Sequence, residues 1–232
     1  MPEAKTVELR QYTLFGGQRD TLIDLFEREF VAPQNQLGAQ VLGSFTDLDD
    51  PDRFVWLRGF DDMEARGQAL PAFYNGAVWH THRDAANATM RDSDNVLLLR
   101  LLTGHLGPRD LGAPGSVYSL NIHYLDRIDG GRFAAFFEET MRPLLEQAGI
   151  DVFATLATEI RPNNFPRLPV REAEQVFVWV AAHRSVADLD ASERRLSALQ
   201  GWRDTVPDDI LAAFMRKPER LRMIPTAVSA LR

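Results

Sequence analysis

The chain has 232 residues, 45% of them hydrophobic, and no cysteine. This length suits one large domain or two modest ones with a packed core, and the lack of cysteine excludes disulfides, a thiolate nucleophile and cysteine-ligated metal sites. A net charge of −7, from 33 acidic and 26 basic residues, disfavours nucleic-acid binding. No apolar run reaches membrane-spanning length, and the start MPEAKTVELR lacks a signal-peptide pattern, so we expect a cytoplasmic protein that does not bind membranes.

In the first half of the chain, hydrophobic periodicity predicts the element order β-α-β-β-α-β. The expected strands are residues 7–14, 39–47, 53–60 and 96–102, and the two in the middle form a hairpin around the turn Asp49-Asp50-Pro51-Asp52. A helix starting at Gln18 should end at Pro33, because proline lacks the N–H that continues a helix. A longer helical region over residues 63–91 should break near Pro71.

The second half follows a segment rich in glycine and proline, residues 104–115, whose composition is typical of a linker. Its expected strands are residues 117–124, 151–160, 175–183 and 221–228. Its expected helices are an amphipathic segment over residues 133–145 and two more over residues 189–202 and 208–215. The element order of the first half is therefore expected again.

Only four tryptophans occur, and their spacing suggests that the chain is doubled. Trp56 and Trp79 are 23 residues apart, as are Trp179 and Trp202, so the pairs are offset by 123 residues. Upstream, Val7 matches Val117 and Phe26 matches Phe136 at an offset of 110. The difference of 13 indicates an insertion, the longer hairpin loop 161–173. We expect a first repeat at 1–104, a linker at 105–115 and a second repeat at 116–232.

A β-α-β-β-α-β unit is the ferredoxin-like arrangement, with two helices on one face of a four-stranded antiparallel sheet. The opposite face is bare, and two units can bury their bare faces against each other. We therefore predict an α+β fold in which tandem ferredoxin-like repeats form, within one chain, what is otherwise a dimeric α/β-barrel.

Two segments of the first half resemble the NIPSNAP family. They are WHTHRDAANATM from Trp79 to Met90, followed by DSDNVLLLR at residues 92–100, and the opening strand ELRQY at residues 8–12. The resemblance is specific in the first half and extends over the chain only through the repeat. It implies the ferredoxin-like barrel fold. Related barrels include cofactor-free monooxygenases, isomerases and haem enzymes, and no catalytic set is carried over from the family.

Aromatic rows on the third strand of each half are the first candidate site. Alternation puts Trp56 and Arg58 on one strand face, and Trp179 and His183 on the matching face of the second half. These side chains are candidates for lining an apolar pocket, with Arg58 and His183 orienting a ligand. The alternative is that they are ordinary core residues.

The helix after the third strand offers a second candidate. Trp79, Arg83 and Asn87 are spaced i, i+4 and i+8 and so share a face, where Arg83 could stack on Trp79 and bind a carboxylate. His82 suits the role of a general base. His80 points away from it on a helix, which disfavours a shared metal ion. The alternative readings are a helix-stabilising cluster and a packing histidine.

Strand residues complete the candidate set. His123 and His183 lie on strands that should be neighbours, and either could be a base or a single haem ligand, although no haem attachment motif occurs. Arg10 and Tyr12 share a strand face with Glu8, which predicts a ligand contact or an ion pair.

The sequence therefore predicts a NIPSNAP-like protein that binds a small hydrophobic or aromatic, partly anionic molecule. The candidate activities are cofactor-independent oxygenation and isomerisation, with His82 or His183 as the general base. We expect no metal and no bound cofactor, because nucleotide-binding, serine-hydrolase and zinc-hydrolase motifs are absent. The alternative is a non-catalytic interaction or scaffold protein. Association into a homo-oligomer is left open.

Overall fold

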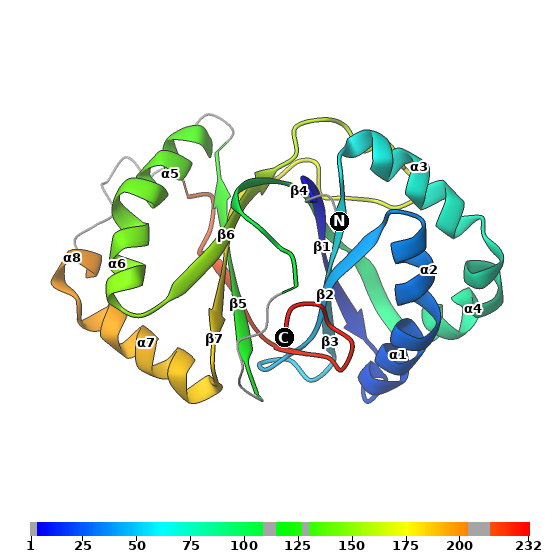
Figure 1. Ribbon diagram of the computed structural model, residues 1–232, viewed down its shortest axis with the longest axis horizontal. Helices are drawn as coiled ribbons and strands as arrows, with labels where there is room; N and C mark the ends of the chain where they lie inside the picture. The colour runs from blue at the N-terminus through cyan, green and yellow to red at the C-terminus, as the bar shows by residue number, and fades with distance from the viewer. Residues whose placement is uncertain (1–3, 109–114, 127–129, 204–213) are drawn as a thin grey trace.

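Eight antiparallel strands close into a barrel at the centre of the molecule (Figure 1). The computed structural model describes residues 4–108, 115–126, 130–203 and 214–232. The strand order around the barrel is β1-β3-β2-β8-β5-β7-β6-β4, and β4 pairs back onto β1. The strands are β1 (Thr6–Leu14), β2 (Gln40–Asp47), β3 (Arg53–Phe60), β4 (Met90–Gly104), β5 (Val117–Leu125), β6 (Asp151–Thr158), β7 (Gln175–His183) and β8 (Glu219–Pro225).

Helices cover the barrel on two opposite sides (Figure 1). The first group is α1 (Arg19–Leu25), the π-helical turn η1 (Phe26–Phe30), α2 (Val31–Gln36), α3 (Met63–Tyr74) and α4 (Ala77–Asn87). The second group is α5 (Gly130–Phe136), the π-helical turn η2 (Phe137–Met141), α6 (Arg142–Gln147), α7 (Val186–Ala198) and α8 (Gln200–Arg203). The predicted mixed α/β architecture is confirmed, and the barrel is closed.

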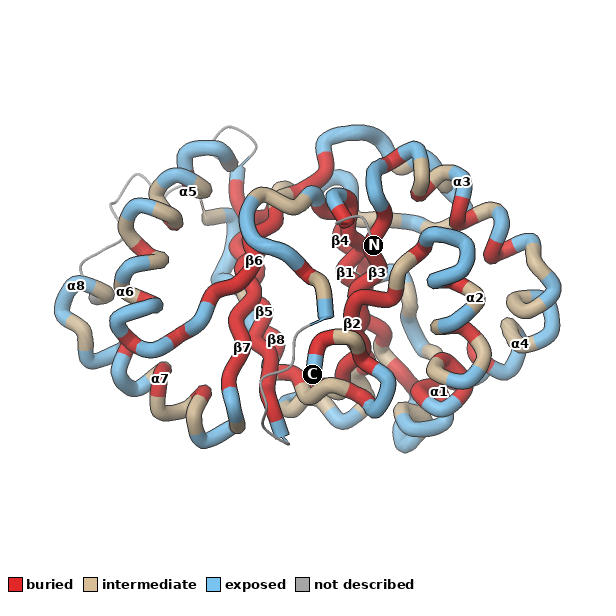
Figure 2. Tube along the Cα trace, in the orientation of Figure 1, coloured by how far each residue is buried: buried red, intermediate tan, exposed pale blue. Residues whose placement is uncertain are grey.

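Alternation along each strand separates the barrel interior from the two helix-facing layers. On β1, Val7 and Leu9 point inward and join a core cluster that includes Ile122 of β5 and Val178 of β7. The side chains between them face the helices. The strands are the most continuously buried part of the chain (Figure 2). The interior is therefore a shared apolar core to which both halves contribute.

Strand register relates the first strands of the two halves by an offset that differs from the one expected from the sequence. Thr6 pairs with Phe60, and Val117 pairs with His183. Because Phe60 and His183 are 123 residues apart, Thr6 corresponds to Val117, which is an offset of 111 and not 110. The π-helical turns agree, since η1 begins at Phe26 and η2 at Phe137.

Two prolines do not end helices where the sequence predicted a break. The helix that begins at Arg19 continues through Pro33 to Gln36, because the π-helical turn η1 lies just before the proline. In η1 the N–H of Val31 donates to the carbonyl of Phe26, five residues back. This wider turn interrupts the regular pattern of helical hydrogen bonds just before Pro33. The helix therefore tolerates the missing N–H and the ring of this proline.

The long helical region of the first half breaks later than expected. Pro71 lies inside α3, and the break falls at Asn75 and Gly76. The following strand is longer than predicted, since β4 begins at Met90 and not at residue 96. The helix expected over 208–215 lies almost entirely outside the described residues.

At Gly104, where β4 ends, the backbone lies very close to that of Phe153 on β6. Gly104 has a φ of +74°, and a Cβ atom there would lie 1.9 Å from the carbonyl oxygen of Phe153. Only glycine accommodates both conditions. Separately, none of the described helices is long and apolar enough to cross a membrane.

Candidate functional site

A cluster of buried charged side chains lies between the first-half strands and their helices. Glu8 of β1 binds three arginines: Arg10 of β1, Arg58 of β3 and Arg66 of α3. We call these four residues the cationic cluster. Glu8 Oε2 accepts from Arg10 Nη1 at 2.9 Å and from Arg58 Nη2 at 2.6 Å, while Oε1 accepts from Arg66 Nε at 2.8 Å. All four side chains are at most 2% exposed.

Neutral oxygens satisfy further donors of the cationic cluster. Arg58 Nη1 donates to Gln34 Oε1 of α2 at 2.9 Å and to the Tyr74 hydroxyl of α3 at 3.3 Å. Arg10 Nε donates to the Tyr12 hydroxyl at 3.0 Å. The cluster thus ties two strands to two helices.

The electrostatics of the cationic cluster favour charge on every member except Arg66. Burial alone would raise the pKa of Glu8, but attraction by Arg58, Arg10 and Arg66 outweighs it and holds that pKa far below its usual value. Burial opposes the charge on Arg58 as well, yet Glu8 raises the pKa of Arg58. Burial dominates at Arg66 and lowers its pKa. With all three arginines charged, one carboxylate leaves two positive charges in excess.

Trp56 of β3 lies against the guanidinium groups of the cluster. The guanidinium carbon of Arg58 is 5.1 Å from the centroid of the indole ring, and that of Arg10 is 5.5 Å away. Such cation–π contacts spread part of the excess positive charge over the ring. Within the described residues, the buried Nε1 donor of Trp56 has no hydrogen-bond partner.

The inserted hairpin loop, residues 161–173, crosses from the second half and covers the cationic cluster. Arg66 Nη1 donates to Asn164 Oδ1 at 2.6 Å and to Asn163 Oδ1 at 3.0 Å. The ring of Phe165 stacks on Tyr74 with centroids 5.9 Å apart. Two differences between the halves, the arginine at position 58 and the inserted loop, therefore meet in one place.

In the second half, the helix-facing residues of β5 and β7 include no acid and no arginine, whereas the neighbouring β8 places Arg220 opposite Asn121 and Arg222 opposite Ser119. By strand register, Ser119, Asn121 and His123 correspond to Glu8, Arg10 and Tyr12, and Ala181 corresponds to Arg58. Trp179 Nε1 donates to His123 Nε2 at 3.1 Å, and Ser119 Oγ is 3.2 Å from His183 Nε2. Burial lowers the pKa of His123 to about 4 and also lowers that of His183.

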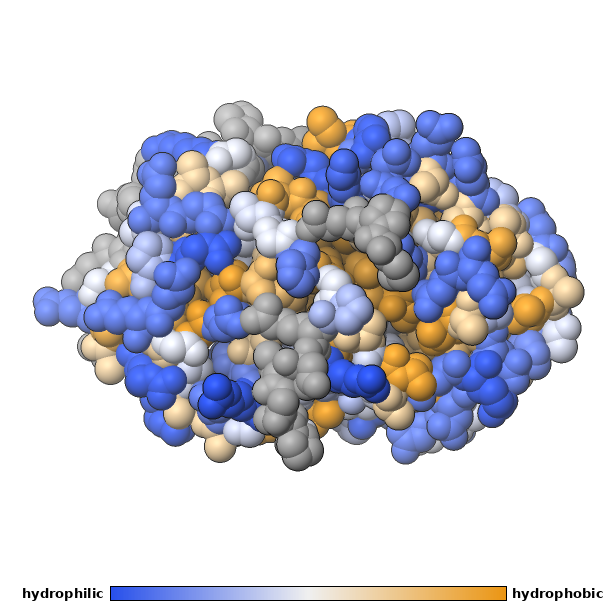
Figure 3. All heavy atoms as spheres, viewed as in Figure 1, coloured by the Kyte–Doolittle hydropathy of each residue, from blue (hydrophilic) through white to orange (hydrophobic). Residues whose placement is uncertain are grey.

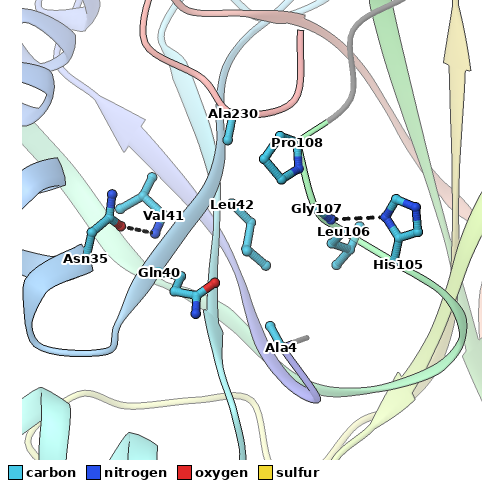
Figure 4. Close-up of a pocket in the computed structure, with 10 residues that line it drawn as sticks. All are labelled: Ala4, Asn35, Gln40, Val41, Leu42, His105, Leu106, Gly107, Pro108 and Ala230. Atoms are coloured by element: carbon cyan, nitrogen blue, oxygen red, sulfur yellow. Dashed lines mark hydrogen bonds between the residues drawn. The ribbon is translucent and has the colours of Figure 1, made fainter. Parts of the chain in front are cut away.

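A cavity of about 490 Å³, the β2 cavity, lies between β2 and the segment that follows β4 (Figure 4). Figure 3 shows apolar side chains around the hollowed middle of this face. The Oδ1 atom of Asn35 accepts from the Val41 N–H at 2.7 Å, and Gln40 extends toward the opposite wall (Figure 4). The lining residues are Ala4, Asn35, Gln40, Val41, Leu42, His105, Leu106, Gly107, Pro108 and Ala230.

Comparison with known proteins identifies the first half. Residues 7–102 match the family model described as NIPSNAP. These residues form a NIPSNAP domain. The curated proteins contain no match to the sequence.

Solved structures share the barrel over nearly the whole chain. An anthrone oxidase-like protein has a TM-score of 0.63 at 11% identity, and the match covers 97% of this chain and 92% of that one. A proposed monooxygenase from Fusobacterium nucleatum has a TM-score of 0.62 at 8% identity, covering 97% and 94%. Another from Lactobacillus acidophilus has a TM-score of 0.58 at 11% identity, covering 96% and 94%. At such identities the likeness concerns the fold and not the activity.

The structure brings part of the predicted site together in the NIPSNAP domain. Arg10, Tyr12, Trp56 and Arg58 all contact the cationic cluster or belong to it. His123, Trp179 and His183 lie in the second-half layer, on the far side of the barrel. None of these residues lines the β2 cavity.

The predicted residues on α4 lie near the outer surface of the NIPSNAP domain. Trp79 packs with Tyr74 at 4.8 Å between ring centroids. Arg83 is paired with Asp84 at 3.4 Å, and the described residues include no stacking of Arg83 on Trp79. Asn87 is exposed. His82 Nε2 is 3.4 Å from Glu29 Oε2 and its ring lies beside Phe30.

Sequence reasoning missed Arg66, Gln34 and Tyr74, and it treated Glu8 only as a default ion-pair partner. A signal for Arg66 was present, because it follows Met63 by three residues and precedes Leu70 by four, within the apolar stripe of α3. A charged residue in such a stripe needs a buried partner. The β2 cavity had no signal, since its walls come from four separate segments of the chain.

Proposed function

We propose that this protein binds a small hydrophobic molecule with an anionic group, and that the β2 cavity is the binding site. The main support for this proposal is the cavity itself. Its volume of about 490 Å³ lies in the range of small-ligand pockets, roughly 300–1,000 Å³. Its walls are mainly apolar. The side-chain amide of Gln40 can donate to and accept from a ligand. The Oδ1 atom of Asn35 already accepts from the Val41 N–H, so Asn35 would contact a ligand through its Nδ2 donor.

The preference for an anion follows from the neighbouring cationic cluster. Val41, a wall residue, pairs with Arg58 across adjacent strands. Asn35, another wall residue, follows Gln34, which accepts a hydrogen bond from Arg58. Two excess positive charges buried in a poorly screened interior create a positive potential in an adjoining apolar cavity. A carboxylate or phenolate is therefore favoured over a neutral group of the same size.

The proposed activity is cofactor-independent oxygenation or isomerisation of such a molecule. Support comes from the barrel fold shared with proteins described as monooxygenases, which is an analogy of fold only. The roles of His82 and His183 as bases, and of Arg83 and Asn87 as ligand contacts, stay predictions.

The binding test compares 2-naphthoate with 2-naphthamide, which share an apolar body and differ in charge. Isothermal titration calorimetry on the full chain should show tighter binding of the naphthoate. Gln40→Trp should fill the cavity and weaken naphthoate binding at least about tenfold, the effect of losing roughly 1.4 kcal/mol of binding free energy. Gln147→Trp, at an exposed position of α6, is the matched control and should bind normally.

Two results would refute the binding proposal. One is an affinity for 2-naphthoate no greater than that for 2-naphthamide, and the other is undiminished binding by the Gln40→Trp variant. Absence of binding by either probe would favour the non-catalytic interaction protein.

Turnover is tested separately with an oxygen electrode, using anthrone as a hydrophobic substrate that forms a phenolate and adding no cofactor. Oxygen uptake above the buffer rate supports an oxygenase, and its absence refutes that activity without touching the binding result. His82→Ala and His183→Ala then test the two predicted bases. If neither variant slows uptake, both roles are wrong.

We also propose that the chain is a tandem pair of ferredoxin-like repeats, with bounds 1–104 and 116–232 joined by a linker at 105–115. The support is that both halves have the sheet order fourth-first-third-second strand, as β4-β1-β3-β2 and β8-β5-β7-β6. Helices follow the first and third strands of each half. The constant register offset between β1 and β5 adds to it.

A further inference from the structure

His105 is the only titratable side chain among the described residues that line the β2 cavity. The other described lining residues bring apolar side chains, a glycine and the two amides of Asn35 and Gln40. The predicted bases His82 and His183 do not belong to the described wall. A proton-transfer step inside this cavity therefore has His105 as its candidate base.

Hydrogen bonding shows which nitrogen of His105 is basic. The N–H of Gly107 donates to His105 Nδ1 at 3.3 Å, so Nδ1 carries a lone pair and the hydrogen of the neutral ring is on Nε2. In Figure 4 this bond lies on the side of the ring that faces the other lining residues. The bond is longer than usual and therefore weak, so a substrate can take the place of the Gly107 N–H.

The exposure of His105 suits repeated proton transfer. The residue lies on the segment that follows β4 and is exposed to solvent. Its ring can therefore exchange protons with water from one side while it borders the cavity on the other. Water also screens the positive charge that the ring carries once it is protonated.

Hydrogen-bond donors and a positive potential lie on the other side of the cavity. Figure 4 shows Asn35 and Gln40 across the cavity from His105. The Nδ2 atom of Asn35 and the amide of Gln40 can donate to an oxygen atom there. Arg58 of the cationic cluster pairs with Val41 on the same wall. Negative charge that develops on a substrate oxygen is therefore stabilised at the wall opposite the base.

Building on the proposed function, we propose that the β2 cavity deprotonates a planar cyclic ketone whose conjugate base is a phenolate, and that His105 is the base. The acidic C–H bond and the carbonyl group of such a substrate lie at opposite ends, as His105 and the two amides do in the cavity. Its flat apolar body matches the mainly apolar walls between them. The site then takes in a neutral ketone and holds it as an anion.

The step is a simple transfer of one proton. The C–H bond breaks, and the proton forms an N–H bond with Nδ1 of His105. The electron pair of the C–H bond moves through the ring system to the carbonyl oxygen, which becomes a phenolate oxygen beside Asn35 and Gln40. The imidazolium returns a proton to water through its exposed side. The step consumes no oxidant, so it precedes any reaction with oxygen.

Proton abstraction is measured by itself with anthrone in D2O under nitrogen, because oxygenation then has no oxidant. Anthrone has its acidic CH2 group and its carbonyl group at opposite positions of the central ring. Proton NMR should show that deuterium replaces the CH2 hydrogens faster with the full chain than in buffer alone.

A single substitution removes the base. His105→Gln keeps a polar side chain and should slow the catalysed exchange by roughly a hundredfold or more, the usual contribution of a general base. It should still bind 2-naphthoate, because Asn35, Gln40 and the apolar walls are unchanged. His80→Gln, which changes an exposed histidine of α4, is the matched control and should leave the exchange rate unaltered.

The pH profile separates a base from a residue that only shapes the cavity. In the unaltered chain the exchange rate should rise with pH and then level off. The midpoint should coincide with the pH at which the His105 ring loses its proton, followed by NMR of the ring. The residual rate of His105→Gln should lack this rise.

The proposal is overturned if the unaltered chain does not accelerate exchange, or if His105→Gln keeps the full rate. It is also overturned if the loss occurs in His82→Ala or His183→Ala and not in His105→Gln, which would favour the bases predicted from the sequence. Binding of 2-naphthoate without exchange would refute the base and leave the β2 cavity as a binding site. Catalysed exchange that depends on His105, without binding of 2-naphthoate, would support the base and refute the anion preference.

Discussion

Among the described residues, Glu8 is the only carboxylate bound to three buried arginines, which makes it the residue whose loss is expected to cost most. Glu8→Gln would leave Arg10, Arg58 and Arg66 without a counter-charge. Removing one partner from a buried ion pair typically destabilises a protein by about 3–5 kcal/mol, because the remaining charge is uncompensated. Urea unfolding at pH 7 measures the change.

The matched control for this prediction is Glu138→Gln. Glu138 pairs with Arg142 on a partly exposed helix surface, where such pairs contribute at most about 1 kcal/mol. Equal effects of the two substitutions would contradict the view that burial makes the Glu8 cluster special. Because the pKa of Glu8 is lowered by folding, its contribution is present above the usual glutamate pKa and decreases as pH falls below it.

His123 should make stability depend on pH in the opposite half of the molecule. The unfolded chain takes up a proton near the usual histidine pKa of 6.5, whereas the folded chain resists it until about pH 4. Stability is therefore complete above pH 6.5 and falls as pH drops toward 4, by about 3 kcal/mol in total. The free energy of unfolding of the unaltered chain should approach that of His123→Phe across this window. Parallel pH curves for the two would contradict the assignment.

At the level of elements, the inserted loop fixes Arg66 from the other half of the chain. Asn164 accepts from Arg66 and donates to the carbonyl of Met63 at the start of α3. Asn164→Ala removes both bonds and leaves a buried guanidinium donor unmatched, so we expect a loss of roughly 1–3 kcal/mol in urea unfolding. Arg167→Ala in the same loop removes one exposed bond to Asn75 and should change stability by less than about 0.5 kcal/mol. A reversed ranking would show that the loop acts through something other than Arg66.

The elements also show where sequence patterns are sufficient. Strand patterns predicted seven of the eight strands to within about three residues, because most of them are runs rich in buried apolar residues that polar turns bound. The start of β4 at Met90 escaped prediction, since residues 91–95 are polar and none of them is buried, and this part of the strand pairs with the end of β1. The helix through Pro33 escaped because a π-helical turn is a matter of backbone geometry with no residue signature.

Strand patterns grouped the candidate residues that share a strand face, and they could not group residues that meet only through tertiary contacts. Arg10, Tyr12, Trp56 and Arg58 are linked by strand face, which alternation can read. Arg66 and Asn164 meet Glu8 and each other from a helix and a distant loop. The roles of His82 and His183 as general bases stay predictions. The presence and spacing of histidines in a sequence do not show what surrounds each ring.

At the scale of the whole molecule, two strand pairings join the halves, β2 with β8 and β4 with β6. These two junctions, here called seams, differ in strength. The β2–β8 seam has three register pairs, whereas the β4–β6 seam has five and continues through the close approach at Gly104. Local opening in proteins starts where few backbone bonds must break together. The barrel should therefore open first between β2 and β8, next to the wall of the β2 cavity.

Amide hydrogen exchange measures this directly. Amides at 45–47, 223, 224 and 226 should exchange faster than those at 99–104 and 154–158 under native conditions. Ser44 Oγ lies 2.7 Å from Thr226 Oγ1 across the weak seam, so Ser44→Ala should speed exchange at β2 and β8 and leave β4 and β6 unchanged. Binding of 2-naphthoate in the β2 cavity should slow the same amides, because a ligand that binds only the closed state stabilises it. Uniform exchange in both seams would mean that the barrel opens as one cooperative unit, and the cavity would then need a different route of entry.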